Sequence, residues 1–205
     1  MSTERREHWN RVYRTKSPDE VSWFESSPAA SLALITRAGV DPGTGAIDVG
    51  AGVSGLAGAL LDAGFKPVAV LDVSREALER LRAKLGEHAA GVEFVETDVT
   101  AFHPTRQYGL WHDRAVFHFL TDSTDQCAYV EVLERALRPG GAAVIAAFAL
   151  DGPTRCSGLD VERYDAATLA SRLGRGFRLL ESRDVLHRTP AGAGQHFGYH
   201  LFRRL

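Results

Sequence analysis

Short apolar segments alternate with segments of helical periodicity through most of the chain. The apolar segments predict strands, because a strand inside a parallel sheet is buried on both faces. Between them, apolar residues recur every three or four positions, and Ser, Asp or Gly often marks the ends of these segments. The expected strands are 46–50, 67–73, 92–98, 108–113, 142–149, 177–186 and 195–202, and the expected helices are 3–13, 28–38, 56–63, 75–85, 125–137 and 166–173.

This alternation predicts an α/β fold with a doubly wound, mostly parallel sheet and right-handed crossovers. The last two strands have no helix between them, so we expect them to pair as a hairpin. No repeat, linker or low-complexity tract is visible, which indicates one domain over residues 1–205. Within it we expect N-terminal helices and a lid in 1–40, a cofactor-binding half in 45–150 and a substrate-side half with the terminal hairpin in 151–205.

Composition narrows the class of protein. The 24 Lys and Arg against 26 Asp and Glu give a formal charge of −2, which argues against a dedicated nucleic-acid surface. No apolar run approaches the roughly 20 residues of a membrane span, and residues 1–8 lack the apolar core of a signal peptide. Two cysteines are too few for a disulfide scaffold. We therefore expect a cytoplasmic enzyme without membrane partners.

A glycine-rich turn follows the first expected strand and carries the main functional signal. Gly50, Gly52 and Gly55 allow a tight turn and a close approach of a ligand to the backbone at the start of a helix. Asp72 ends the second strand, 22 residues after Gly50, where such folds bind ribose hydroxyls. Asp98 ends the third strand over the same edge of the sheet.

Asp48 separates two classes of ligand at this turn. A dinucleotide would place a pyrophosphate there, and a carboxylate beside it would be repelled. S-adenosylmethionine (SAM) carries an ammonium and a sulfonium instead, and both favour a nearby acid. A carboxylate that only braces the turn is the simpler alternative for Asp48.

These motifs resemble those of the class I (Rossmann-like) SAM-dependent methyltransferases. "AIDVGAGVSGL" is similar to their first motif, "VAVLDVS" to the second, "VETDVT" to the adenine-side acidic segment and "LRPGGAAVI" to the turn into the fifth strand. The resemblance implies a seven-stranded sheet with an antiparallel final strand, and SAM as cofactor. It implies contacts to the methionine end, the ribose and the adenine. The implied cofactor-binding residues are Asp48, Gly50, Ala51, Gly52, Asp72, Val73, Asp98, Val99, Asp113 and Trp23.

The fourth strand, "YGLWHDRAVFHFL", resembles the thiopurine methyltransferases, in which an Asp-Arg pair borders the substrate. That family has Trp directly before Asp-Arg, whereas His112 intervenes here, which puts the correspondence of Asp113 and Arg114 in doubt. The N-terminal "HWNRVY" and "VSWFESSP" resemble the lid of the same family and of small protein-lysine methyltransferases. Four aromatic residues of this lid could close over a sulfonium or simply pack in the core. They are Trp9, Tyr13, Trp23 and Phe24.

The candidate catalytic residues lie at the end of the fourth strand. His118 and His112 are the candidates for accepting a proton from an amine or hydroxyl acceptor, with a structural role as the alternative. Arg114 could steer an anionic substrate or brace Asp113. Cys156, in the 151–159 loop, could line the substrate pocket, although a structural thiol is the simpler interpretation. The spacing of the histidines predicts no metal site.

The leading hypothesis is methyl transfer from SAM to a heteroatom of a small molecule by in-line displacement. A protein-lysine methyltransferase is the main alternative, favoured by the short chain and the lid. An NAD(P)-dependent oxidoreductase or a non-catalytic nucleotide-binding module is a third. We expect a monomer or homodimer, and a lid that becomes ordered when the cofactor binds.

Overall fold

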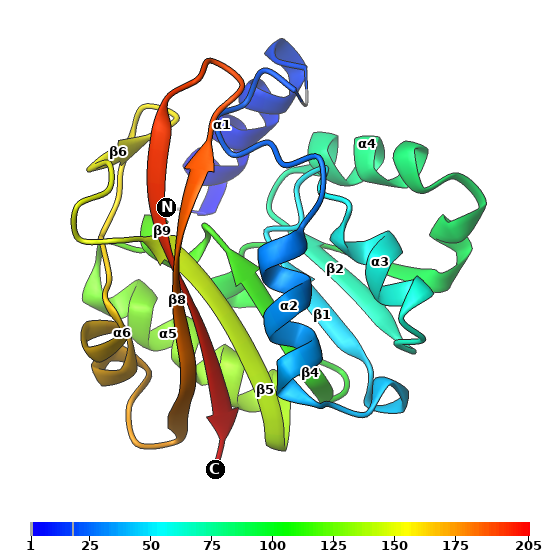
Figure 1. Cartoon of the computed structure of the whole chain (residues 1–205). Helices are drawn as coiled ribbons and strands as arrows, with labels where there is room; N and C mark the ends of the chain where they lie inside the picture. Colours follow the sequence, from blue (N-terminus) through cyan, green and yellow to red (C-terminus); the bar gives the residue numbers. More distant parts are fainter. Residues whose placement is uncertain (1, 18) are drawn as a thin grey trace.

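A seven-stranded sheet forms the centre of the molecule (Figure 1). In the computed structural model, which describes residues 2–17 and 19–205, the strands lie in the order β3-β2-β1-β4-β5-β9-β8. Strand β9 runs antiparallel to both of its neighbours, and the other pairs are parallel. This confirms the predicted mostly parallel sheet with an antiparallel terminal strand. The strands are β1 (Ala46–Val49), β2 (Val68–Asp72), β3 (Val92–Glu96), β4 (Tyr108–Arg114), β5 (Leu137–Phe148), β8 (Phe177–Arg188) and β9 (Gly194–Arg204).

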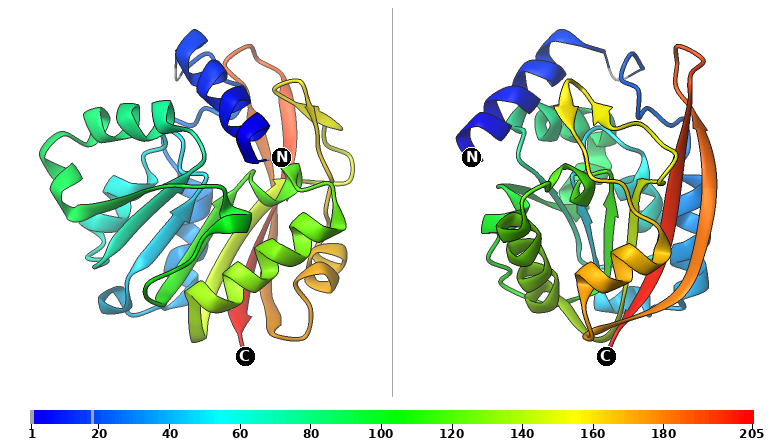
Figure 2. Two further views of the ribbon diagram at one scale, coloured as in Figure 1. Left: turned by 180° about the vertical axis from the view of Figure 1, so that it is seen from behind. Right: turned by 90° about the vertical axis from the view of Figure 1, so that its left-hand side faces the viewer.

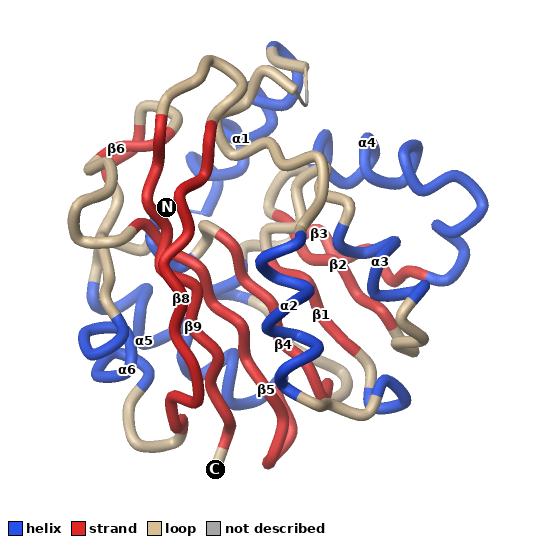
Figure 3. Tube along the Cα trace, in the orientation of Figure 1, coloured by secondary structure: helices blue, strands red, loops and turns tan. Residues whose placement is uncertain are grey.

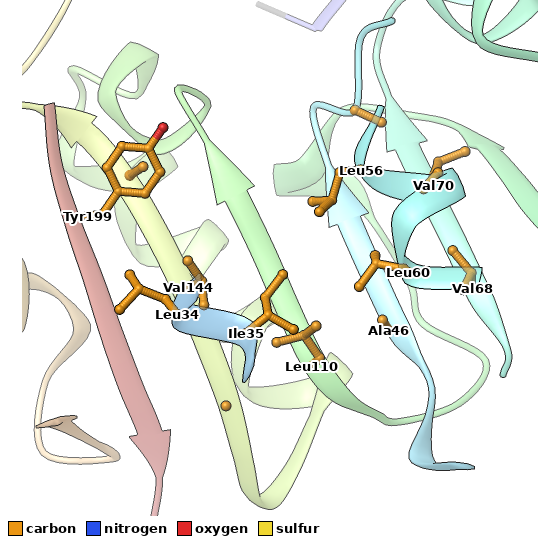
Figure 4. Packing of buried hydrophobic residues seen from close by; sticks show 14 of the residues in the cluster. Leu34, Ile35, Ala46, Leu56, Leu60, Val68, Val70, Leu110, Val144 and Tyr199 are labelled. Carbon is orange, nitrogen blue, oxygen red and sulfur yellow. The ribbon is translucent and has the colours of Figure 1, made fainter. Parts of the chain in front are cut away.

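Helices cover both faces of the sheet (Figures 1 and 3). Helices α2 (Ala29–Ala38), α3 (Leu56–Asp62) and α4 (Arg75–Leu85) pack in one buried apolar cluster, and α5 (Ser123–Ala136) and α6 (Ala166–Leu173) pack in the other. In Figure 4, Leu34 and Ile35 of α2 lie over the same face of the sheet as Leu56 and Leu60 of α3. The apolar stripes of these helices thus bury both faces of the sheet, as a doubly wound fold requires.

The remaining N-terminal helix packs differently. Helix α1 (Ser2–Thr15) lies across the edge of the sheet at which the parallel strands end, beside α4 (Figure 2). Ligands of open α/β sheets bind outside the carboxyl ends of the strands. Helix α1 therefore covers the position where a site is expected. Among the described residues, no helix combines the length and the apolar character needed to cross a membrane.

Several predicted boundaries differ from the structure. Asp122 caps α5 through the backbone N–H of Thr124, so the helix begins at Ser123 rather than at 125. Leu137, predicted to end this helix, is already the first residue of β5. Helix α2 begins at Ala29 rather than at 28, because Pro28 occupies the N-cap position, and no side chain caps the helix there. Residue 18, a proline at which the sequence predicts the N-terminal helical pattern to be broken, lies outside the described residues.

A small antiparallel pair was not predicted. Strands β6 (Arg155–Cys156) and β7 (Leu159–Asp160) form it within the loop that follows β5. Two residues in each strand are too few for an alternating pattern to be visible in the sequence. The pair matters because it brings Cys156 to the same edge of the sheet as α1.

Candidate functional site

Two adjoining compartments lie at the carboxyl edge of the sheet. The larger one encloses about 830 Å³, partly open to solvent, and reaches from Val73 and Asp98 to Phe148 and Phe197. The smaller one encloses about 660 Å³ around the glycine turn after β1. Four residues line both compartments and so mark their junction. They are Tyr13, Trp23, Gly50 and Arg114.

The turn after β1 needs glycine at two positions. Gly50 has φ +63° and Gly52 has φ +53°, in the left-handed region that favours glycine. A Cβ on Gly50 would lie 2.0 Å from Cγ2 of Val116, and one on Gly52 would lie 2.5 Å from the hydroxyl oxygen of Tyr13. The backbone N–H groups of Gly50 and Ala51 donate to the carbonyl oxygen of Leu71, at 2.7 and 3.2 Å. Both glycines therefore keep the floor of the compartments open.

Asp48 is held from one side and free on the other. Its Oδ1 lies 2.7 Å from Nδ1 of His112, and Nε2 of His112 lies 2.8 Å from the hydroxyl of Ser31 on α2. All three residues are buried and line the smaller compartment. The second carboxylate oxygen, Oδ2, is also buried but has no hydrogen-bond partner among the described residues. A buried carboxylate oxygen without a donor is costly, so this oxygen indicates a missing ligand group.

Asp72 stands at the end of β2 and braces the turn. Its Oδ2 accepts from the backbone N–H of Gly52 at 2.9 Å, and its Oδ1 accepts from that of Ser74 at 2.8 Å. Burial raises the pKa of Asp72 to about 6, and the charge of Asp48 adds to the rise. The backbone hydrogen bonds oppose that shift, since they favour the ionised form. The neighbouring Val73 lines the larger compartment with Asp72.

Asp98 lies two residues beyond β3, at the far end of the larger compartment. It caps the short 3-10 turn Val99–Ala101 through the backbone N–H of Thr100, at 3.0 Å. Its other oxygen pairs with Arg5 of α1, at 3.1 Å, and Arg5 also pairs with Asp125 of α5. Val99 lines the same end of the compartment. Arg5 thus fastens α1 to the side of the site where the resemblance implies adenine.

Asp113 lines neither compartment and points into the opposite core. It accepts hydrogen bonds from the backbone of Val116 at 2.8 Å and of Phe117 at 3.1 Å, and from the hydroxyl of Tyr129 at 2.6 Å. Burial raises its pKa to about 6. These partners use both carboxylate oxygens. Asp113 therefore shapes the turn after β4, on which other site residues stand.

Arg114 follows Asp113 but faces the site. Its Nε donates to the hydroxyl of Tyr199 at 2.8 Å, and one terminal nitrogen donates to the carbonyl oxygen of Trp23 at 2.9 Å. The other terminal nitrogen lies 3.1 Å from a carboxylate oxygen of Glu25. Arg114 thereby joins the end of β4 to β9 and to the segment 21–25.

His118 lies behind the wall of the larger compartment. Its ring packs against Phe148 at 4.8 Å and against Phe119 at 4.5 Å between ring centroids, and it lines neither compartment. The side chain is fully buried and neither ring nitrogen has a partner among the described residues. Burial lowers its pKa to about 3. The ring is therefore neutral at physiological pH.

The predicted lid aromatics gather over the larger compartment. Trp9 lies 5.6 Å from Trp23 and 5.1 Å from Phe119 between ring centroids, and Tyr13 lies 6.3 Å from Trp23. Three of the predicted lid aromatics, Trp9, Tyr13 and Trp23, line the larger compartment together with Phe119. The fourth, Phe24, lines the smaller compartment. Cys156 is buried in the wall of the larger compartment, and burial raises the pKa of its thiol.

Several residues of the site have no clear signal in the sequence. Ser31, Phe148 and Phe197 reach the site from α2, β5 and β9, and only the packing of distant elements brings them there. Asn10 of α1 accepts hydrogen bonds from the Ser74 hydroxyl at 2.8 Å and from a backbone N–H of α4. Over residues 2–17 and 19–205, no cluster of three or more His, Cys, Asp or Glu is arranged to bind a metal.

Comparisons with known proteins identify the fold and match part of the chain to a family. Residues 46–141 match the family described as "Methyltransferase domain". No curated protein sequence matches the chain. A solved structure from work on the conversion of a disulfide bond into a thioacetal group during echinomycin biosynthesis is 24% identical, with a TM-score of 0.79, over 97% of this chain and 92% of that one.

Two further solved structures are similar over nearly the whole chain. The 1,6-didemethyltoxoflavin-N1-methyltransferase of Burkholderia thailandensis, solved with S-adenosylhomocysteine (SAH), is 21% identical, with a TM-score of 0.69 over 98% and 84% of the two chains. A SAM-dependent methyltransferase of Anabaena variabilis is 15% identical, with a TM-score of 0.77 over 100% and 95%. At these identities the structural similarity establishes the fold. Residues 46–141, slightly less than half of the chain, match the methyltransferase-domain family, and the chain as a whole shares its fold with these solved methyltransferases.

Proposed function

We propose that this enzyme transfers the methyl group of SAM to a nucleophilic heteroatom of an apolar small molecule. The observation that carries the proposal is the aromatic end of the larger compartment, which adjoins the glycine turn and is lined in part by Trp9 of α1. Trp9, Phe119, Phe148 and Phe197 line that end. Such a wall suits an apolar molecule of modest size.

The residues present fit SAM as the cofactor. The unpartnered Oδ2 of Asp48 could accept a hydrogen bond from the ammonium group of the methionine end. Gly50 and Gly52 leave space that a Cβ would fill, and Asp72 stands where the ribose hydroxyls are expected. When bound, SAM supplies a methyl group activated by a positively charged sulfur. The acids beside the turn favour this ligand over a dinucleotide, whose pyrophosphate they would repel.

The two compartments suggest where each part of the reaction takes place. The smaller compartment, with Asp48 and the glycine turn, would hold the methionine end. The end of the larger one near Val73, Asp98 and Val99 would hold the adenosine. The junction then leaves the aromatic end for the acceptor, with Tyr13 and Trp23 beside the reacting centre.

The chain's contribution is to position the reactants and to exclude water. An in-line displacement needs the nucleophile about 3 Å from the methyl carbon in a dry site. Helix α1 and Trp23 cover the junction of the two compartments. A terminal nitrogen of Arg114 donates a hydrogen bond to the carbonyl oxygen of Trp23 at 2.9 Å and holds this residue in place. Asp113 holds the turn that carries Val116, whose side chain packs over Gly50. These residues would orient the reactants without taking part in the bond changes.

Calorimetry with SAM and SAH tests the cofactor assignment, with NAD as the comparison ligand. We expect binding of both adenosyl ligands and none of NAD. Incubation with SAM and separate pools of small molecules and of protein extract then tests the acceptor class, with SAH formation as the readout. Folded protein that binds neither ligand would overturn the proposal, and turnover confined to the protein extract would assign a protein substrate instead.

A further inference from the structure

We infer that the methyl acceptor is an uncharged atom with a lone pair and no proton to lose, such as a sulfide sulfur or a pyridine-type ring nitrogen. The inference rests on the proposed function and specifies its substrate class. It follows from the groups that line the acceptor end of the larger compartment and from those that do not reach it.

The acceptor end offers apolar and aromatic surface. Trp9, Trp23 and Phe119 form one side through edge-to-face contacts at 5.1–5.6 Å between ring centroids. Phe148 and Phe197, 4.7 Å apart, form another. All five side chains line the compartment. Aromatic faces attract cations and pack well against sulfur and aromatic rings.

No proton acceptor reaches this end from the described part of the chain. Both ring nitrogens of His112 are taken, by Asp48 and by Ser31. His118 lies behind Phe119 and Phe148, and burial holds its pKa at about 3. A group with so low a pKa is a weak general base at neutral pH, and the ring of His118 lines neither compartment. Neither histidine could therefore deprotonate an amine, hydroxyl or thiol acceptor.

The other titratable groups of the two compartments do not act as the general base in place of these histidines. Asp72 and Asp98 stand at the adenosine end, and each is already bound by backbone N–H groups. Burial raises the pKa of Tyr13 and of Cys156, so both stay protonated at neutral pH. Glu25 lines the smaller compartment and is paired with Arg114.

An anionic acceptor finds no free positive charge at this end either. Arg114 lines it, but its guanidinium donates hydrogen bonds to Tyr199 and Trp23. Its remaining terminal nitrogen makes no hydrogen bond among the described residues but lies in an ion pair with Glu25, at 3.1 Å. The carboxylate of Glu25 offsets its charge. Arg5, at the opposite end, is held by Asp98 and Asp125. Burying a carboxylate or phenolate here would leave the anion uncompensated, which is costly.

A neutral, proton-free acceptor needs neither a base nor a counterion. Its lone pair forms the new bond to the methyl carbon while the carbon–sulfur bond of the cofactor breaks, and the electron pair of that bond stays on the sulfur. No proton is transferred. One positive charge disappears from the cofactor and one appears on the acceptor, so the total charge is constant and the aromatic wall can stabilise it throughout.

Matched probes test this inference with two readouts. Isoquinoline and methyl phenyl sulfide are the proton-free probes, and 2-naphthol and phenylmethanethiol are protic probes of similar shape that stay protonated at neutral pH. Binding to the SAH-loaded protein is followed by quenching of tryptophan fluorescence. Trp9 and Trp23 line the site, whereas Trp111 is buried in the opposite core, bonded to Tyr129, and should give a constant background. Turnover with SAM is followed by SAH formation and by proton release.

We expect the proton-free probes to quench the fluorescence and to be methylated without release of protons, at a rate that at saturating SAM is independent of pH. The protic probes should react about 100-fold more slowly, the factor that a general base usually contributes. Faster methylation of the protic probes, with one proton per turnover, would overturn the inference and leave the proposed function intact. Failure of both proton-free probes to bind and react, with a protein that binds SAM, would also overturn it. Absence of SAM binding would instead refute the proposed function.

Discussion

The free oxygen of Asp48 should decide how tightly the cofactor binds. In Asp48→Asn, the side-chain oxygen can still accept from His112, but the amide presents a donor where the ligand's ammonium group is expected. We expect SAM affinity to fall by about 1.5–3 kcal/mol, which is roughly a ten- to hundred-fold rise in Kd, with the fold retained. Calorimetry measures the change. Asp62→Asn, at an exposed site on α3, is the matched control, and equal Kd values for the two variants would contradict the assignment.

Asp72 should make SAM binding depend on pH. The ionised carboxylate accepts from Gly52, Ser74 and the expected ribose hydroxyls, and protonation removes part of that capacity. Burial puts its pKa at about 6. Affinity should therefore be complete above about pH 7 and fall as the pH drops through about 6 towards 5. Calorimetry across this range, with Asp72→Asn as a weaker and flatter comparison, tests the sign, and rising affinity towards low pH would contradict it.

His118 and His112 should respond differently to the same substitution. His118→Leu removes two buried nitrogens without partners, so we expect unchanged or higher thermal stability and turnover within about threefold of the native enzyme. His112→Leu leaves the buried side chains of Asp48 and Ser31 without their hydrogen-bond partner. This substitution should lower the free energy of unfolding by about 1–3 kcal/mol. A loss of turnover by about 100-fold in His118→Leu would instead identify it as a general base.

At the residue scale the sequence was most informative for residues at or just beyond the carboxyl end of a strand. Asp48, Gly50, Asp72 and Asp98 could be placed because the ends of parallel strands meet at one edge of a sheet. The histidines could not be assigned, because their roles depend on partners from distant elements. The Nε2 atom of His112 is occupied by a hydrogen bond with the hydroxyl of Ser31 on α2. No periodicity in the sequence of β4 indicates that contact.

At the scale of elements, the position of α1 depends on a few polar contacts. Arg5 pairs with Asp98 and Asp125, and Arg80 of α4 donates to the carbonyl oxygen of Lys16 at 2.8 Å. Arg5→Ala would leave two largely buried carboxylates without their cation. We expect amide hydrogen exchange in α1 to accelerate about tenfold or more. Arg14→Ala, at an exposed position of the same helix, is the control and should leave the exchange rates unchanged.

Cofactor binding should have the opposite effect on the same segment. Tyr13 and Trp23 border both compartments, so a bound ligand adds contacts to α1 and to residues 19–24. We expect SAH to slow hydrogen exchange there relative to the free protein, while exchange in α5 and α6 changes little. Equal protection with and without SAH would mean that this cover is a static part of the core.

The elements themselves were predictable where one pattern dominated. The buried strands and the helices with one apolar stripe were found with boundaries correct to within a few residues. The junction between α5 and β5 was misplaced because Leu137 continues the helical spacing, although its backbone already joins the sheet opposite Tyr108. The pairing of distant strands decides such a residue, and local propensity does not contain that information.

For the whole molecule, the clearest expectation is stabilisation by the cofactor. A ligand that binds only the folded state at about 100 times its Kd adds about 2.7 kcal/mol. For a chain of this size that corresponds to a rise in Tm of roughly 5–10 °C. Differential scanning calorimetry with SAH should show this shift, and NAD at the same concentration should give none. Equal shifts with both ligands would point to nonspecific nucleotide binding.

The segment that borders both compartments, which contains Tyr13 and Trp23, also has a kinetic consequence. Because Tyr13 of α1 and Trp23 border the space for both ligands, movement of this one segment would widen the exit for both products. Release of the methylated product and of SAH should then be limited by one opening event rather than by two independent dissociation rates. Steady-state turnover would in that case fall as solvent viscosity rises, even with acceptors whose chemical step is fast.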